Sequence, residues 1–189
     1  MEFRDGPSWK VSFGDAQVLD IALYIRDVAA LAPVNTTQIP RLVPRVEVTD
    51  AVTDGSIAAD QWGAWWDTAV SVGPAALLDL QPPNFEGFGN APELQSLLRR
   101  HFDSALRWAN ERARVRDDEH GPPIGRIVRV VEASIGRAAQ PFMLRLTRLS
   151  VEGKQAWRVA DDHVLITDEL VSDADSFADT LRPIIESIA

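Results

Sequence analysis

Apolar residues recur every three or four positions through much of the chain up to residue 136, a spacing typical of amphipathic helices. The pattern is clearest in residues 91–116, where Leu94, Leu98 and Phe102 fall on one side. Asn90 stands where a helix N-cap belongs, and an acidic residue follows three positions later, as in a capping box. We therefore expect a long helix here, with its apolar side turned toward a core.

Two further segments show the same spacing. Residues 15–32 predict an amphipathic helix, and the three prolines in residues 33–44 predict an extended linker after it. The sequence RVEV at residues 45–48 predicts a short strand. Residues 124–136 are rich in β-branched side chains, which favours a strand, but their isoleucines and valines also follow helical spacing and Gly136 could close a helix. We interpret this segment as a helix.

Beyond residue 140 the apolar spacing changes to two, which is typical of strands. Residues 141–149, 155–160 and 163–170 predict three short strands joined by turns. A closing helix is expected to start at Ser172, with Asp175 as the reciprocal partner in its cap. Because helices come first and strands cluster late, the predicted class is α+β. In this fold, N-terminal and central helices pack with a C-terminal three-stranded antiparallel meander and a closing helix.

The length of 189 residues suits a single domain, with a mainly helical part in residues 1–136 and the meander plus C-terminal helix in residues 137–189. The absence of cysteine excludes disulfides, thiolate metal ligands and cysteine nucleophiles. The first ten residues show no basic region followed by an apolar run, and no stretch approaches the roughly 20 apolar residues that span a bilayer. We therefore expect a cytoplasmic protein without a membrane partner.

Charge is segregated along the chain. Residues 1–90 carry a net charge of −7, residues 91–150 carry +4 and residues 151–189 carry −6, which gives −9 in total. Seventeen of the nineteen basic residues are arginine, a balance that indicates a bacterial source with a GC-rich genome. The overall acidity disfavours nucleic acid as a partner, because binding to phosphates depends on a basic surface.

Three tryptophans within five positions are the most unusual local feature. Trp62, Trp65, Trp66 and Ala69 stand at i, i+3, i+4 and i+7, on one face of a helix. Such a face most often fills a core, and each indole can bury roughly 150–250 Å². Trp65 and Trp66, however, point about 100° apart around a helix, so a single core would not cover both. We expect at least one of the three to stay partly exposed at a partner surface.

Two acidic clusters each end in a histidine, DDEH at residues 117–120 and DDH at residues 161–163. Carboxylate and imidazole groups together suit divalent ions such as manganese or zinc. If the clusters meet in the fold, the candidate ligands are Asp117, His120, Asp161 and His163. The alternative is that both clusters are solvated turns, for which these residue types are also common.

Several arginines lie on or near the polar side of the long helix, among them Arg99, Arg100 and Arg107. The planar guanidinium pairs with carboxylate or phosphate, so these residues could dock an acidic partner or a nucleotide. Alternatively, they neutralise the acidic segments on either side within the fold.

Signatures of common enzyme classes are absent from the sequence: it contains no G-x-S-x-G, no G-x-x-x-x-G-K-[ST] and no H-E-x-x-H. We therefore predict a non-enzymatic, cytoplasmic protein-binding module without a cofactor. It would be an adaptor, an immunity-type protein or a subunit of an assembly, and would bind another protein through aromatic and arginine-rich surfaces. The alternative prediction is a small metal-dependent hydrolase that uses the DDEH and DDH clusters.

Overall fold

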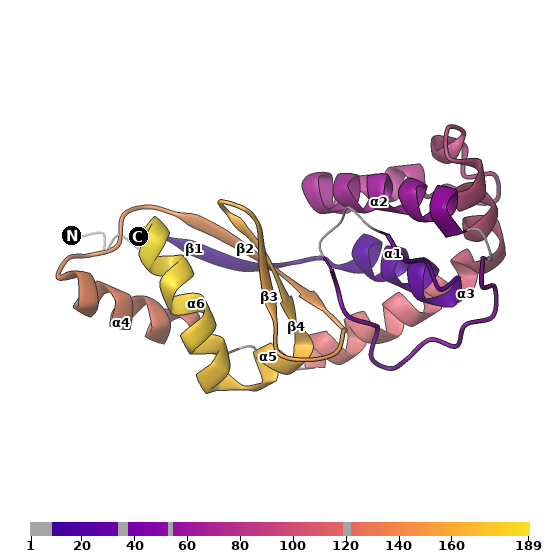
Figure 1. Ribbon diagram of the computed structural model, residues 1–189. Helices are drawn as coiled ribbons and strands as arrows, with labels where there is room; N and C mark the ends of the chain where they lie inside the picture. Colours follow the sequence, from indigo (N-terminus) through magenta and orange to yellow (C-terminus); the bar gives the residue numbers. More distant parts are fainter. Residues whose placement is uncertain (1–8, 34–37, 53–54, 119–121) are drawn as a thin grey trace. The chain divides into compact units, whose positions relative to one another are not determined.

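The computed structural model of the protein describes residues 9–33, 38–52, 55–118 and 122–189. The chain folds into two compact units (Figure 1). The first, here called the helical unit, comprises the described residues of 15–119 and 149–152. The second, here called the sheet unit, comprises the described residues of 1–14, 120–148 and 153–189. Helices and a four-stranded sheet coexist, so the predicted α+β class is confirmed.

The division between the units differs from the expected boundary at residue 136. The segment predicted as a helix over 124–136 forms α4 (Ile124–Ile135), and this helix belongs to the sheet unit. A strand that the apolar pattern did not reveal, β1 (Lys10–Gly14), belongs there as well. Whether the whole chain behaves as a single folding domain stays a prediction.

In the helical unit, α1 (Gln17–Val28) packs against both α2 (Gly55–Val72) and α3 (Pro92–Asp118). These elements confirm the helices predicted over 15–32 and 91–116. None of them is long and apolar enough to cross a membrane, nor is any other helix in the described part of the chain. The sequence predicts one apolar side for α1, but in the structure the helix is buried on nearly every side. A helix enclosed in this way has to find partners for its polar side chains inside the unit.

Arg26 and Asp27 of α1 meet this requirement by holding the proline-rich segment that follows. The Arg26 guanidinium donates to the Asp27 carboxylate at 2.7 Å and to the carbonyl oxygens of Ile39 and Pro40 at 2.6 and 2.7 Å. The second carboxylate oxygen of Asp27 accepts from the backbone N–H of Leu42 at 2.8 Å. Since prolines remove backbone donors, this segment has few partners of its own, and the two side chains supply them.

Asp20 is the third buried polar side chain of α1, and it is fully buried against α3. Its two carboxylate oxygens accept from the two terminal nitrogens of Arg116 at 2.6 and 3.0 Å. Arg116 also donates to the hydroxyl of Ser150 at 2.9 Å. This bidentate pair joins the last turn of α3 to the first turn of α1 inside the helical unit.

The strand predicted at residues 45–48 does not form, so that prediction is wrong. The chain after it is instead fixed at the end of α1, where the N–H groups of Thr49 and Asp50 both donate to the carbonyl of Val28 at 3.1 and 3.2 Å. An isolated bridge forms nearby, between Leu42 and Val151.

The sheet unit contains β1, β2 (Met143–Leu149), β3 (Ala156–Ala160) and β4 (His163–Thr167), in the spatial order β1-β2-β4-β3 (Figure 1). The three late strands are confirmed, but the predicted meander order is wrong because β4 lies between β2 and β3. β1 runs parallel to β2, with Val11 opposite Leu144, and β3 runs antiparallel to β4, with Ala156 opposite Ile166. Strand alternation identified the strands but not their neighbours.

α4 and α6 (Ala174–Ile188) form one apolar core with alternate residues of β2 and β4. The core includes Val128 and Val131 of α4, Leu144 and Leu146 of β2, Val164 and Ile166 of β4, and Phe177, Leu181 and Ile185 of α6, all of them buried.

The closing helix does not start at Ser172 as predicted, because that residue ends a separate short helix, α5 (Asp168–Ser172). The N-cap of α6 is Asp173, whose carboxylate accepts from the N–H of Ser176 at 3.0 Å. The Lys154 ammonium also donates to this carboxylate, and the two interactions hold the pKa of Asp173 well below its usual range. Asp is as good an N-cap as Ser, so the sequence pattern alone could not separate the two neighbours.

Candidate partner-binding surface

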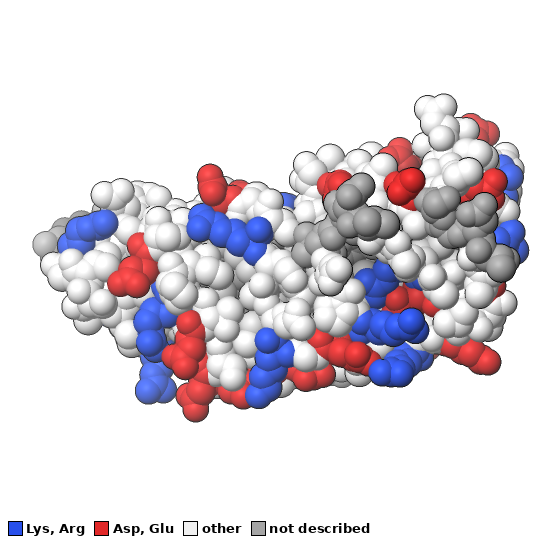
Figure 2. Space-filling view, viewed as in Figure 1, with Lys and Arg blue, Asp and Glu red and all other residues white. Residues whose placement is uncertain are grey.

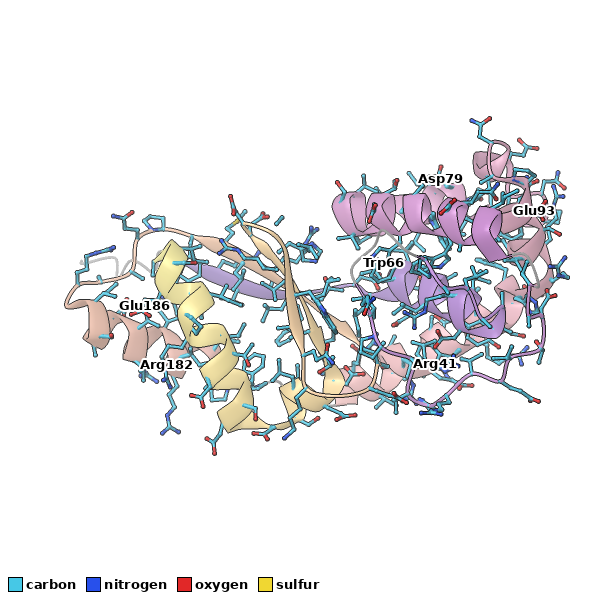
Figure 3. All side chains as sticks on the ribbon, in the orientation of Figure 1. Arg41, Trp66, Asp79, Glu93, Arg182 and Glu186 are labelled. Carbon is cyan, nitrogen blue, oxygen red and sulfur yellow. The ribbon has the colours of Figure 1, made fainter. Side chains whose placement is uncertain are left out.

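The three tryptophans of α2 belong to the core of the helical unit. Trp62 and Trp66 stack with ring centroids 5.4 Å apart and planes 16° apart. The indole N–H of Trp62 donates to the carbonyl of Ala22 in α1 at 2.7 Å. Trp66 lies between α2 and α1 (Figure 3). This pair therefore fixes α2 against α1.

Trp65 is buried against a different neighbour. Its ring forms a T-shaped pair with the ring of Phe88, at a centroid distance of 5.3 Å and an interplanar angle of 88°. Phe88 belongs to the 3-10 turn η2 (Glu86–Phe88). The exposed fractions of Trp62, Trp65 and Trp66 are 1%, 7% and 2%. The expectation that one of them stays exposed is therefore wrong. The tryptophans pack against two neighbours, α1 and η2, so side chains that point in different directions from α2 are all buried.

The three candidate arginines of α3 are all exposed, but they differ in their partners. Arg100 donates to the carboxylate of Asp50 at 2.6 Å, and His101 contacts the same carboxylate oxygen at 2.9 Å. These hydrogen bonds, that of His101 first, lower the pKa of Asp50. Arg99 donates to the carbonyl of Asn84 at 3.0 Å. Arg107 has no side-chain hydrogen bond or ion pair with any described residue.

Arg100 thus pairs with an acidic residue inside the fold, as the neutralisation hypothesis predicts. Arg107 has no such pairing, so the hypothesis of partner binding still applies to it. Ion pairs elsewhere in both units follow the first pattern, as between Arg26 and Asp27 or between Arg148 and Asp168. Acidic and basic side chains are accordingly intermixed on the face shown in Figure 2. The charge segregation along the sequence does not become a one-sign surface on this face.

A partly exposed aromatic group does occur in the helical unit, at Trp108 of α3. Its ring lies 6.4 Å from that of Tyr24 in α1, at an interplanar angle of 56°. The guanidinium carbon of Arg112 lies 6.0 Å from the Trp108 ring centroid, a cation–π distance. All three side chains are neither buried nor fully exposed. We call Tyr24, Trp108 and Arg112 the Trp108 cluster.

Reasoning from the sequence misses this cluster because helical spacing places Trp108 beside the apolar side of the long helix, where a core position is expected. One signal was available: Trp108 and Arg112 are four residues apart, which places them side by side on a helix. The contact with Tyr24 joins α1 to α3, and no local pattern predicts it.

His163, one of the candidate metal ligands, is buried in the sheet unit with an exposed fraction of 3%. Its Nδ1 lies 3.0 Å from a terminal nitrogen of Arg145, and its Nε2 lies 2.9 Å from the hydroxyl of Thr147. Because a guanidinium can only donate, Nδ1 accepts, and the proton of the neutral ring is on Nε2. Burial first, and then the charge of Arg145, lower the pKa of His163 to about 4. The ring is therefore neutral at pH 7 and has its Nδ1 lone pair engaged.

The other candidate ligands do not form a recognisable metal site. Asp161 is fully exposed in a turn beside Arg158, Asp117 is exposed near the end of α3, and His120 lies outside the described residues. Within the described ranges, no group of three His, Asp or Glu side chains lies close enough together to hold a metal ion. A site made of the DDEH and DDH clusters stays a prediction.

A scan against family models and searches of curated proteins and solved structures found no match to this chain. The chemistry of its own surfaces is therefore the basis for a functional proposal.

Proposed function

We propose that this chain is a non-enzymatic protein-binding module and that its helical unit binds the partner through the Trp108 cluster. The observation that carries the proposal is the partly exposed Trp108 ring with Tyr24 on one side and the Arg112 guanidinium near its face. Tryptophan, tyrosine and arginine are the side chains that dominate binding energy at protein interfaces.

The physical reason is that each member combines apolar area with one polar end. Indole and phenol rings bury large surfaces at a low cost in conformational entropy. Arg112 is already placed near the ring, so a partner carboxylate can pair with it without reordering a long side chain. Because its position is already fixed by the ring, such an arginine is a strong anchor for an acidic partner.

Arg107 precedes Trp108 in α3 and points about 100° away from it around the helix, so it lies at the edge of this surface and not within the cluster. It is exposed and makes no ion pair with a described residue, so its charge is available to a partner. Exposed charges at the edge of an interface mainly raise the association rate and make it depend on salt. Binding is thus expected to weaken as ionic strength rises, with most of the affinity residing in the aromatic anchor.

Capture from a lysate of the native host by the immobilised full chain tests the proposal. A protein retained by the wild type is expected to be lost with Trp108→Ala and with Arg112→Glu, while circular dichroism shows that both variants are folded. Arg129→Glu is the matched control, because Arg129 is exposed on α4 in the other unit. Retention that is equal for all of these variants would contradict the proposal.

A further inference from the structure

The sheet unit has a groove of about 490 Å³ between α4 and α6, a volume within the range of ligand-binding clefts. Its apolar lining comes from both helices and includes Ile127 and Val130 of α4 and Ala174 and Ala178 of α6. Val130 is 45% exposed, so its side chain presents apolar surface to the groove. Outside this lining, the hydroxyl of Ser134 donates to the carboxylate of Glu186 at 3.4 Å between the same two helices. The groove therefore combines an apolar floor with charged side chains from both helices.

The two walls of this groove carry opposite charges. Arg126 lines the α4 wall, whereas Asp175 and Asp179 line the α6 wall. Asp179 is paired with Arg182 of the same helix at 3.3 Å, and both residues line the groove. Among the described residues, neither Arg126 nor Asp175 has an ion-pair partner. The groove thus offers one guanidinium on its α4 side and one carboxylate on its α6 side that pair with no described residue.

The shape and charge of the groove together select the occupant. The α6 wall runs from Asp175 to Arg182, about 10 Å of helix, or two turns. A second copy meeting this face by two-fold symmetry would set groove against groove, and two concave surfaces leave both floors uncovered. A convex element is required, and an amphipathic helix fits, because its apolar side is flanked by two polar sides.

We propose that the groove between α4 and α6 binds two turns of an amphipathic helix from a partner protein. Aliphatic side chains at i and i+4 of that helix contact Val130 and Ala178. An acidic side chain on one flank pairs with Arg126, and a basic side chain on the other flank pairs with Asp175. This site lies in the sheet unit and does not depend on the Trp108 cluster.

The probe for this site is a capped, fluorescein-labelled peptide of about 14 residues, four helical turns, with leucines along one side, glutamates on one flank and lysines on the other. Fluorescence anisotropy with the full chain is expected to show saturable binding. Arg126→Glu is expected to weaken it about tenfold, because it turns an attractive pair into a repulsive one. Arg129→Glu makes the same charge change one turn away, outside the lining of this groove, and is expected to leave affinity within about twofold.

Two further comparisons make the result decisive. A peptide with lysines on both flanks is expected to bind Arg126→Glu more tightly than the wild type, which a merely unfolded variant could not do. Val130→Gln is expected to weaken the original peptide, whereas Ala133→Gln, on the exposed side of the same helix, leaves its affinity unchanged. Absence of saturable binding overturns the proposal, as does equal loss with Arg126→Glu and Arg129→Glu. Sedimentation that shows a wild-type dimer abolished by Arg126→Glu, without peptide binding, would assign the face to a second copy.

Discussion

Replacement of Trp62 tests whether the tryptophans of α2 hold the helical unit together. The Trp62 side chain is 1% exposed, stacks on Trp66 at 5.4 Å and donates to the Ala22 carbonyl at 2.7 Å. Trp62→Ala removes all three contributions and leaves a cavity between α1 and α2. Trp62→Phe keeps an aromatic ring in the core but removes the N–H donor and part of the volume.

The expected losses follow from these contacts. Truncation of a buried tryptophan to alanine costs about 3–5 kcal/mol of unfolding free energy. For Trp62→Phe, loss of one buried hydrogen bond costs about 1 kcal/mol and the missing volume adds a similar amount, so we expect about 2 kcal/mol. Ile57→Ala in the same helix is the control, because Ile57 is 60% exposed and its truncation should change stability by less than about 0.5 kcal/mol.

Urea unfolding followed by circular dichroism at the helix band measures all three variants. Trp62→Ala can consume much of the stability of a typical domain, about 5–15 kcal/mol, so Trp62→Phe supplies the quantitative comparison. The assignment of α2 to the core would be refuted if Trp62→Phe lost no more stability than Ile57→Ala.

Three further predictions concern polar groups. The pKa of His163 is lowered to about 4 in the fold and is near 6.5 in the unfolded chain. The free energy of unfolding should therefore fall as pH decreases from about 6.5 to about 4, by at most about 3 kcal/mol. Urea unfolding measured across this pH range should show a smaller fall for His163→Gln. Asp20→Asn removes the buried carboxylate that accepts two hydrogen bonds from Arg116, and it should cost about 3–5 kcal/mol in urea unfolding. Asp103→Asn, on the exposed side of α3, should cost less than about 0.5 kcal/mol, and equal losses would contradict the role of the pair. Manganese or zinc should not raise the melting temperature, because His163 has its Nδ1 engaged by Arg145; a saturable rise that His163→Ala abolishes would favour the hydrolase hypothesis.

Local apolar spacing was sufficient to predict most elements of this fold. Residues 91–116 carry clear helical spacing, residues 124–136 carry it alongside many β-branched side chains, and both segments are helices in the structure. The spacing of apolar residues could not predict which strands pair when they are far apart in the sequence. β1 pairs with β2 across more than 120 residues, and five residues with a weak alternation gave no sign of it. The strand order failed for the same reason, since alternation says which side of a strand is buried and not which strand lies next to it.

The candidate site was harder to predict, because its residues are distinguished from similar ones only by the side chains that they contact in the fold. Arg100 and Arg107 look alike in the sequence, yet only the first meets an acidic side chain, Asp50, which is 50 positions away. Trp108 resembles the tryptophans of α2 but stays partly exposed, because its neighbours are Tyr24 and Arg112. The residue type predicts which interactions a side chain can make. Tertiary contacts decide whether it makes them within the fold or stays available to a partner.

Site-specific photocrosslinking tests the central claim most directly, that the Trp108 cluster is a partner-binding surface. A benzophenone amino acid is placed at Ser104, which is exposed one helical turn before Trp108 and leaves the cluster intact, or, as a control, at Arg129, and intact cells of the native host are irradiated. The account predicts a discrete heavier adduct from position 104 that is absent from position 129 and is lost when Trp108→Ala is added. Irradiation that yields no adduct at 104, or yields the same adducts from both positions, would contradict it.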